Sequence, residues 1–222
     1  MYTRSIVALL IFSSCCIWPS AWAEPVVDDD FNPLGYYTFR QDLRRCVSPR
    51  CGGLFVKAVN QKLTRCADGV KRTECYVALL ANPHGLAIGS ASLLQGRIRP
   101  KRFSGFGNLG VFKLRAAISS ATASTGEGTV VGLQDNGIVC ITAPCFSYDE
   151  FVLNRNKILL LSGIDLEASG AAEQDIDNAR RLLADGETLL AAGVNKRMAA
   201  RAGAGTAFFA NQLYFPIEPE SP

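Results

Sequence analysis

Two short cysteine pairs are the part of this chain with the clearest chemical options. The segments Cys46-Val-Ser-Pro-Arg-Cys51 and Cys140-Ile-Thr-Ala-Pro-Cys145 share one pattern: Cys, a β-branched apolar residue, a hydroxyl residue, two further residues and Cys. Reactive dithiols usually have two intervening residues, which favour a thiolate of low pKa at a helix start. Because four residues intervene here and one of them is Pro, the pattern favours a structural disulfide over a redox site.

Metal binding is another use of such cysteines, and the sequence argues against it. No cysteine spacing matches a zinc ligand set, and His84 is the only histidine. A Ser–His–Asp site would also depend on His84 as its base, and no Gly-x-Ser-x-Gly segment accompanies it. We therefore expect no metal, no cofactor and no nucleophilic catalysis.

Acidic residues in the second half of the chain leave one enzymatic alternative open. Asp149 and Glu150 follow the second cysteine pair, and Asp165 and Glu167 follow an apolar run. Two facing carboxylates can serve a glycosidase, but helix caps and surface charge also explain these acids. The sequence favours a non-enzymatic protein, with a hydrolase-type enzyme that uses these acids as the alternative.

The number of cysteines indicates an oxidising compartment. The chain has eight, and cleavage after Ala23 removes Cys15 and Cys16. Six remain, an even number, as a disulfide framework requires. In the second half, Cys140 and Cys145 are the only cysteines and most simply pair together. By analogy, and then by remainder, the other expected disulfides are Cys46–Cys51 and Cys66–Cys75.

The N-terminus has the features of a secretory signal over residues 1–23. Arg4 supplies a positive charge, residues 5–12 form a short apolar core, and Ala21-Trp22-Ala23 is a small-x-small cleavage site. The alternative is a lipoprotein anchored at Cys15. The sequence thus predicts a secreted or periplasmic protein, and no later segment is long and apolar enough to span a membrane.

Charge is distributed unevenly along the chain. Residues 31–120 carry 15 Lys and Arg against 3 Asp and Glu, whereas residues 121–222 carry 7 against 13. Either the two halves pack and partly neutralise each other, or the first half presents a polyanion-binding face. The second interpretation predicts an anionic envelope component or an acidic glycan as partner, with no nucleic acid expected. Its candidate ligand-binding residues are Arg40, Arg44, Arg45, Arg50, Arg97, Arg99, Lys101 and Arg102.

A stapled turn that contains Pro49 or Pro144 is preorganised, and preorganisation lowers the entropic cost of association. A protease inhibitor that presents one of these cystine loops is therefore a further alternative. A loop that only fixes a strand crossover would need the same residues and no partner.

The elements that position these residues follow a duplicated pattern. Each cysteine pair is preceded by a strand-like segment and followed by two short apolar runs that suit buried strands, and Asn60 and Asn154 lie at the same distance from the pairs. A helix is expected at 171–184, and a short glycine-interrupted one at 85–94. The expected fold class is α+β: two pseudo-repeats of mainly antiparallel sheet with one helix each, stapled by disulfides.

Composition sets the expected boundaries between these parts. We expect a signal peptide at 1–23, a flexible acidic leader at 24–34, a basic repeat at 35–119, a linker at 120–128, an acidic repeat at 129–217 and a tail at 218–222.

Several motifs together resemble a bacterial secreted domain of unknown function with a duplicated Cys-x4-Cys module. The motifs are Arg-Arg-Cys-Val-Ser-Pro-Arg-Cys-Gly-Gly at 44–53, Cys-Ala-Asp-Gly at 66–69 and Glu-Cys-Tyr-Val at 74–77. Residues 135–145 and 162–166 look like its second half, so the resemblance spans roughly residues 35–216. It implies secretion and the disulfides, and it brings no established activity, substrate or catalytic residue.

Overall fold

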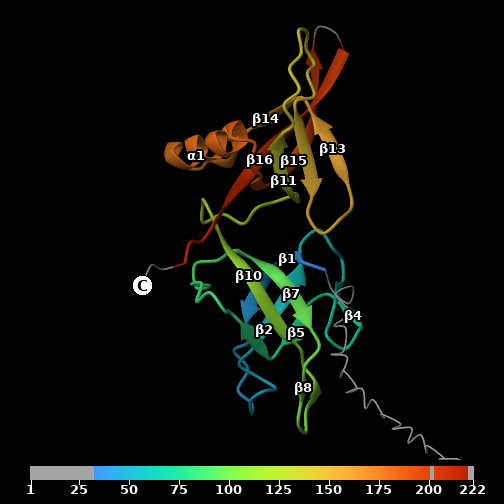
Figure 1. Ribbon diagram of the computed structural model, residues 1–222, viewed down its shortest axis with the longest axis vertical. Coiled ribbons are helices and arrows are strands. Elements are labelled where there is room, and N and C mark those ends of the chain that lie inside the picture. Colours follow the sequence, from blue (N-terminus) through green and yellow to red (C-terminus); the bar gives the residue numbers. More distant parts are fainter. Residues whose placement is uncertain (1–32, 201–202, 220–222) are drawn as a thin grey trace, which may run out of the picture.

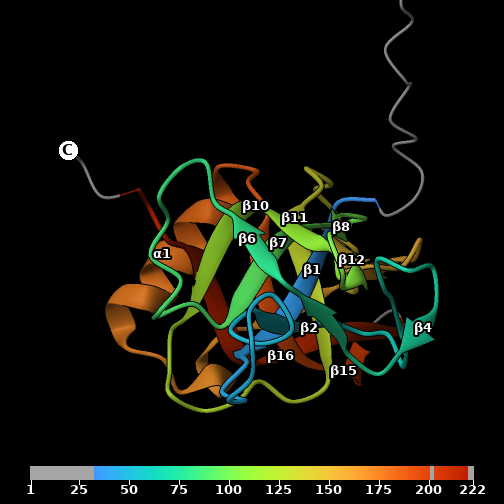
Figure 2. The same ribbon diagram turned by 90° about the horizontal axis from the view of Figure 1, so that it is seen from below.

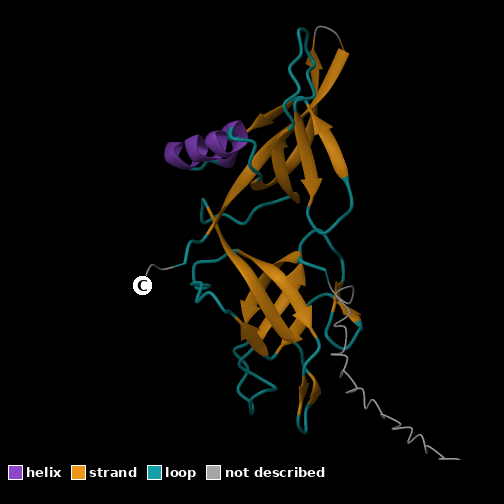
Figure 3. Ribbon diagram, in the orientation of Figure 1, coloured by secondary structure: helices purple, strands orange, loops and turns teal. Residues whose placement is uncertain are grey.

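The computed structural model describes residues 33–200 and 203–219. Strands predominate in this part of the chain, with one α-helix (Figure 3). They form two lobes stacked along the long axis, which we define as the first lobe, residues 35–120, and the second lobe, residues 129–216 (Figure 1). The predicted signal peptide, Cys15 and nearly all of the acidic leader lie outside the described residues.

The expected class of mainly antiparallel sheet is confirmed, and so are the three disulfides. The paired cysteines are Cys46–Cys51, Cys66–Cys75 and Cys140–Cys145. The peptide bonds before Pro49 and Pro144 are both cis. In the described part of the chain, no helix is long and apolar enough to cross a membrane.

The first lobe is a small sheet closed by one bent strand. Its antiparallel order is β5-β2-β1-β7-β10, and β6 pairs parallel with β10. Only Ala78 separates β5 from β6, so the same stretch of chain pairs with both ends of the sheet and closes it. The bounds are β1 Gly35–Gln41, β2 Leu54–Ala58, β5 Cys75–Val77, β6 Leu79–Ala81, β7 Leu93–Arg99 and β10 Val111–Ser120, with short ribbons β3 Thr64–Arg65, β4 Lys71–Arg72, β8 Arg102–Phe103 and β9 Gly107–Asn108.

Alternation of side chains gives the first lobe an inside and an outside. Along β2, Leu54, Val56 and Ala58 are buried, whereas Phe55 and Lys57 point outward. The inward side chains of neighbouring strands pack into one core, whose members include Tyr37, Val56, Val77, Leu94, Ile98 and Phe112. The outward side chains of β1, β2 and β5 are thereby left for other contacts.

The second lobe has the order β13-β12-β11-β15-β16, and β14 pairs parallel with β16. Only Ser162 separates β13 from β14, so this sheet is also closed by one bent stretch of chain. Beyond the closed part of this sheet, β15 and β16 continue as a long hairpin (Figure 1). The bounds are β11 Thr129–Asp135, β12 Tyr148–Val152, β13 Ile158–Leu161, β14 Gly163–Asp165, a 3-10 turn at Glu167–Ser169, α1 Glu173–Ala184, β15 Leu189–Ala200 and β16 Gly203–Pro216.

The helix expected at 171–184 forms as α1. Glu173 and Asp175 lie in its first turn, where acidic residues are favoured, and Ile176, Ala179 and Leu183 are buried. The prediction of a second helix at 85–94 is wrong, because residues 82–92 form a loop. Its backbone is held instead by Asn82, whose side-chain oxygen accepts from Leu86 N at 3.0 Å and whose amide donates to Leu86 O at 2.9 Å.

A glycine beneath a buried aromatic ring occurs in each lobe. A Cβ atom at Gly96 would lie 2.4 Å from the ring of Phe112, and one at Gly193 would lie 2.8 Å from the ring of Phe208. Both rings are nearly inaccessible to solvent. Because no larger residue fits beside these rings, each lobe requires glycine at this point of its sheet.

The two lobes meet at a seam where Asn60 and Asn154 each bind the backbone of the opposite lobe. Asn60 donates to Val130 O at 2.6 Å and to Leu153 O at 3.0 Å, and it accepts from Val130 N at 3.0 Å. Asn154 makes the corresponding bonds to Tyr36 O at 2.6 Å, Val59 O at 3.1 Å and Tyr36 N at 2.9 Å. Each asparagine thus satisfies three backbone groups across the seam.

Further contacts tie the seam together. The ends of β10 and β16 pair antiparallel, with Ser119 opposite Phe215. An apolar cluster contributed by both lobes lies beneath these hydrogen bonds, and its buried members are Val59, Leu93, Ile118, Leu153, Leu190, Ala192 and Tyr214. The lobes are therefore joined by packing and by hydrogen bonds, and they form one continuous twelve-stranded sheet.

Glu150 is a buried carboxyl in the second lobe. Its residue is 2 % exposed, and Asn195 donates to its Oε2 at 2.5 Å. Burial raises the pKa of Glu150, and the Asn195 hydrogen bond and the charge of Lys157 only partly oppose this. The fold therefore favours the protonated form of Glu150 relative to the unfolded chain.

The seam asparagines lead to a first prediction. Asn60→Ala removes three partly buried hydrogen bonds and places Ala at φ 57°, so we expect a loss of about 2–4 kcal/mol in the free energy of unfolding, measured by urea denaturation. Asn60→Gly tolerates that φ and isolates the loss of the hydrogen bonds. Stability unchanged in both variants would contradict the role of the seam.

The buried carboxyl leads to a second prediction. Because the folded-state pKa of Glu150 is raised, its stabilising effect is complete below the unfolded pKa, about 4.3, and is lost as pH rises through the folded pKa. The melting temperature of the wild type should therefore fall relative to that of Glu150→Gln as pH increases from about 4. Glu187→Gln, at an exposed site, is the control. Parallel melting curves at all pH values for wild type and Glu150→Gln would refute the assignment.

Candidate functional site

A row of outward side chains crosses the first lobe and forms its most distinctive surface. Arg40 lies opposite Phe55 in the β1–β2 pair, and Phe55 lies opposite Tyr76 in the β2–β5 pair. The Arg40 guanidinium lies 4.0 Å above the centre of the Phe55 ring, and the centres of the two rings are 5.4 Å apart. Arg44 adds a second guanidinium, 5.1 Å from Phe55 and 5.3 Å from Tyr76. We call these four side chains the platform.

Carboxylates hold both guanidinium groups in place on the platform. Arg40 pairs with Glu74, with a Nε–Oε2 distance of 3.1 Å. Arg44 binds Asp42 through two nitrogens, at 2.9 and 3.0 Å. The side chain of Asp42 is fully buried, and the hydrogen bonds from Arg44 hold the pKa of this carboxyl below its usual range. Planar guanidinium groups fixed in this way expose a flat, polar surface to solvent.

The first cystine loop is fastened to the edge of the platform. Tyr76 donates its hydroxyl to Pro49 O at 2.7 Å, and Arg44 donates to Arg50 O at 3.0 Å. The Cys46–Cys51 disulfide closes the loop. With three fixed points the loop forms a wall at this end of the lobe, and Figure 2 looks onto that end from below.

The β8–β9 hairpin forms a second wall. The Arg50 guanidinium lies 5.8 Å from the Phe106 ring near the hairpin tip, so the cystine loop and the hairpin approach each other. Asn108 donates to Ala67 O at 3.2 Å and anchors the base of the hairpin. A hollow of about 230 Å³ lies between the platform and this base, lined by residues that include Phe55, Asp68, Arg72, Glu74, Tyr76 and Asn108.

Six of the eight predicted basic residues belong to the platform or to the two segments that flank it. Arg40 and Arg44 belong to the platform, Arg45 and Arg50 to the cystine loop segment, and Lys101 and Arg102 to the hairpin segment. The segments 40–51, 66–76 and 100–109 carry three carboxylates, Asp42, Asp68 and Glu74, each paired with an arginine. Their eight cations are Arg40, Arg44, Arg45, Arg50, Lys71, Arg72, Lys101 and Arg102.

The other two predicted residues, Arg97 and Arg99, lie elsewhere. They are on β7, around a separate hollow of about 440 Å³ that is also lined by His84, Lys113 and Arg115. Arg99 is buried. Arg97 lies opposite Lys113 in the β7–β10 pair. These cations therefore lie on β7 and β10, whereas the paired side chains of the platform lie on β1, β2 and β5. The eight residues predicted to form one basic face therefore lie on two separate surfaces of the first lobe.

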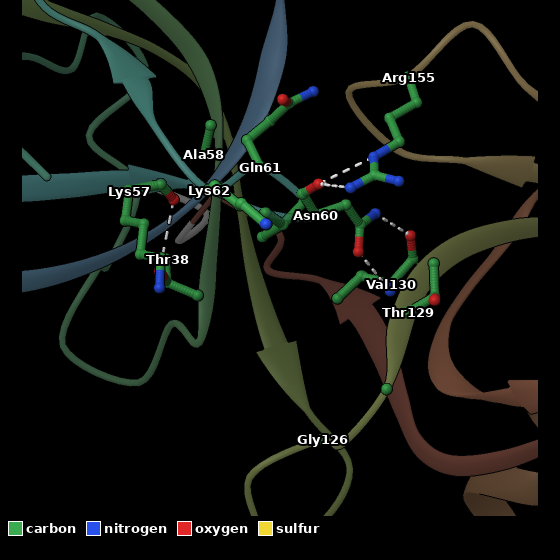
Figure 4. A pocket seen from close by; sticks show the side chains of 12 residues that line it. Thr38, Lys57, Ala58, Asn60, Gln61, Lys62, Gly126, Thr129, Val130 and Arg155 are labelled. Atoms are coloured by element: carbon green, nitrogen blue, oxygen red, sulfur yellow. Dashed lines mark hydrogen bonds between the residues drawn. The ribbon is translucent and has the colours of Figure 1, made fainter. Parts of the chain in front are cut away.

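A further hollow of about 580 Å³ lies at the seam (Figure 4). The first lobe contributes Thr38, Lys57 and Lys62, and the second lobe contributes Arg155, which donates to Asn60 O at 2.9 Å. No carboxylate is among the residues that line it. No local sequence pattern predicts this group of cations, because only the packing of the lobes places Arg155 near the lysines.

The acids considered for hydrolysis are each used in a structural contact. Asp149 accepts from Asn136 at 3.0 Å, and Glu150 is buried beside Asn195. Asp165 accepts from Ala168 N at 3.1 Å, and Glu167 pairs with Arg180. Among the described residues, no group of three His, Cys, Asp or Glu side chains could hold a metal ion.

The second cystine loop differs in character from the first. It lies at the opposite end of the molecule, beside the β15–β16 hairpin (Figure 1). Val139 is 95 % exposed, and Ile141 is fully exposed. A protease inhibitor would need an exposed loop of this kind. The exposed side chains of this loop are apolar, whereas the first loop carries Arg50.

Both lobes lie within one region that matches a known protein family. The chain matches the family described as Domain of unknown function (DUF6748) over residues 35–220. Comparisons with the curated proteins and with the solved structures gave no match. The matched region contains the three disulfides, the platform and the seam. The chain therefore belongs to the DUF6748 family of domains of unknown function.

Proposed function

We propose that this protein is a secreted or periplasmic binding protein that recognises an acidic glycan through the platform and its two walls. The observation that carries the proposal is the stacking of Arg40 and Arg44 on Phe55 and Tyr76, between loops that bear further cations. The three disulfides fit an oxidising compartment.

The chemistry of the platform suits an acidic sugar. Fixed guanidinium groups stack against flat ligand faces and donate to carboxylate or sulfate oxygens. Arg45, Arg50, Lys101 and Arg102 supply charge that the three nearby carboxylates do not neutralise, since those carboxylates are engaged by Arg40, Arg44 and Arg72. The same charges would steer a polyanion toward this end of the molecule.

The order of strands supports binding at this place. We propose that the lobes are two copies of one module, because β1, β2, β5–β6, β7 and β10 pair in the same scheme as β11, β12, β13–β14, β15 and β16. Counted in this way, each lobe resembles the OB-fold, a five-stranded Greek-key barrel. OB-folds bind oligosaccharides or oligonucleotides on strands two and three and between the loops that follow strands one and four. The cystine loop and the β8–β9 hairpin occupy those loop positions; this support is an analogy of fold.

The second lobe lacks the chemistry of the platform. The strand pairs that correspond to Arg40–Phe55 and Phe55–Tyr76 place Gln134 opposite Asp149 and Asp149 opposite Leu160. An amide, a carboxylate and an aliphatic side chain would not attract an acidic ligand. We therefore propose a platform of this kind in the first lobe and none on the corresponding face of the second lobe.

A charge reversal tests the proposal. Lys101→Glu/Arg102→Glu changes the hairpin wall without touching the platform, and we expect elution from immobilised heparin at clearly lower salt than the wild type. Arg181→Glu/Lys196→Glu makes the same charge change on the second lobe and should elute like the wild type. Equal elution of the first variant and the wild type would remove the support for this site.

The class of ligand is tested separately. Single-stranded DNA also carries repeated charges and flat rings, and it is the other ligand class of OB-folds. In competition with heparin at the same salt concentration, we expect heparin oligosaccharides to displace a labelled heparin probe more effectively than oligo-dT of matched charge does. Stronger displacement by oligo-dT would overturn the assignment to a glycan.

A further inference from the structure

We propose that the ligand is an extended chain of repeating anionic units, which lies along the outward face of β1 and β2 from the platform to the seam hollow. This inference rests on the proposed function and adds the length of the ligand and a second set of contacts. It makes the seam part of the binding site rather than only a joint between lobes.

The outward face of β1 and β2 is continuous between the two places. Thr38 follows Arg40 as the next outward residue of β1, and Lys57 follows Phe55 on β2. Thr38 and Lys57 lie opposite each other, one step along the ladder from the Arg40–Phe55 pair. Successive outward residues on a strand are about 7 Å apart. Thr38 and Lys57 themselves line the seam hollow, so the hollow and the platform are neighbours on the same face of β1 and β2.

The seam end of this face carries its own positive charge. Lys57 and Lys62 come from the first lobe and Arg155 from the second (Figure 4). Arg155 is held in place by its bonds to Asn60 O, while both lysines are exposed. Gln61 donates to Asn154 O at 2.5 Å and completes the junction below them. The fixed guanidinium of Arg155, together with the ammonium groups of the two exposed lysines, suits an anionic group on a flexible chain.

Two cationic ends on one face favour a long ligand over a short one. A short oligosaccharide reaches only one end, whereas a longer chain binds the second end as an intramolecular step at high effective concentration. Affinity should therefore increase steeply once the chain spans both ends and level off afterwards. Because Arg155 belongs to the second lobe, this arrangement also requires both lobes to be present in the ligand-binding protein.

The test measures affinity for heparin-derived oligosaccharides of increasing length by isothermal titration calorimetry at fixed salt. The wild type should show a steep increase in affinity over a narrow range of lengths. Lys57→Glu/Lys62→Glu should bind the shortest oligosaccharides like the wild type and lose about tenfold or more in affinity for the longest ones. Arg181→Glu/Lys196→Glu is the control for charge, and melting temperatures confirm that each variant is folded.

The possible outcomes separate this inference from the proposed function. If Lys57→Glu/Lys62→Glu binds long oligosaccharides as well as the wild type does, the extended site is wrong and the platform alone can still be the binding site. If that variant loses affinity equally at all lengths, the seam is a compact site and the extended chain is also refuted. If Lys101→Glu/Arg102→Glu keeps full affinity at all lengths, the proposed function itself fails.

Discussion

The reciprocal bonds of Asn60 and Asn154 are the constraint on which the rest of the structure depends. Each side chain inserts a carboxamide into the other lobe and binds two carbonyls and one N–H there. Both residues have left-handed backbone conformations, at φ 57° and 58°, which asparagine tolerates better than most residues do. The relative placement of the lobes is therefore specified by polar groups with few alternative partners, and the apolar cluster beneath them adds the contact area.

Closure of each sheet decides where a ligand can bind. The interior of the first lobe is filled by Phe112, Leu94 and their neighbours, so it offers no space for a ligand. The proposed glycan site therefore uses the outside of the strands, where outward side chains alternate with core side chains in a fixed order. The platform and Lys57 are consequences of that order, since they occupy the outward positions of strands whose inward positions form the core.

The sequence predicted local features correctly, but it did not predict which distant residues lie close together in the folded protein. The disulfides, the predominance of antiparallel strands and α1 follow from spacing and periodicity that act over a few residues. The cations could also be identified from the sequence. Whether Arg40 or Arg97 shares a face with Phe55 depends on the order of strands in the sheet, which the sequence of a single strand does not determine. The glycine-interrupted helix expected in the first lobe does not form, because the Asn82 side chain binds the backbone of Leu86 and holds this segment as a loop. The proximity of Arg155 to Lys57 required the seam and was beyond any local pattern.

The stacking of the two lobes along the long axis gives the molecule two ends of different chemical character (Figure 1). The two cystine loops lie at opposite ends of the long axis (Figure 1), one cationic and one with Val139 and Ile141 bare to solvent. Contacts made at one pole do not obstruct the other. The two loops therefore present different chemistry at places that do not overlap.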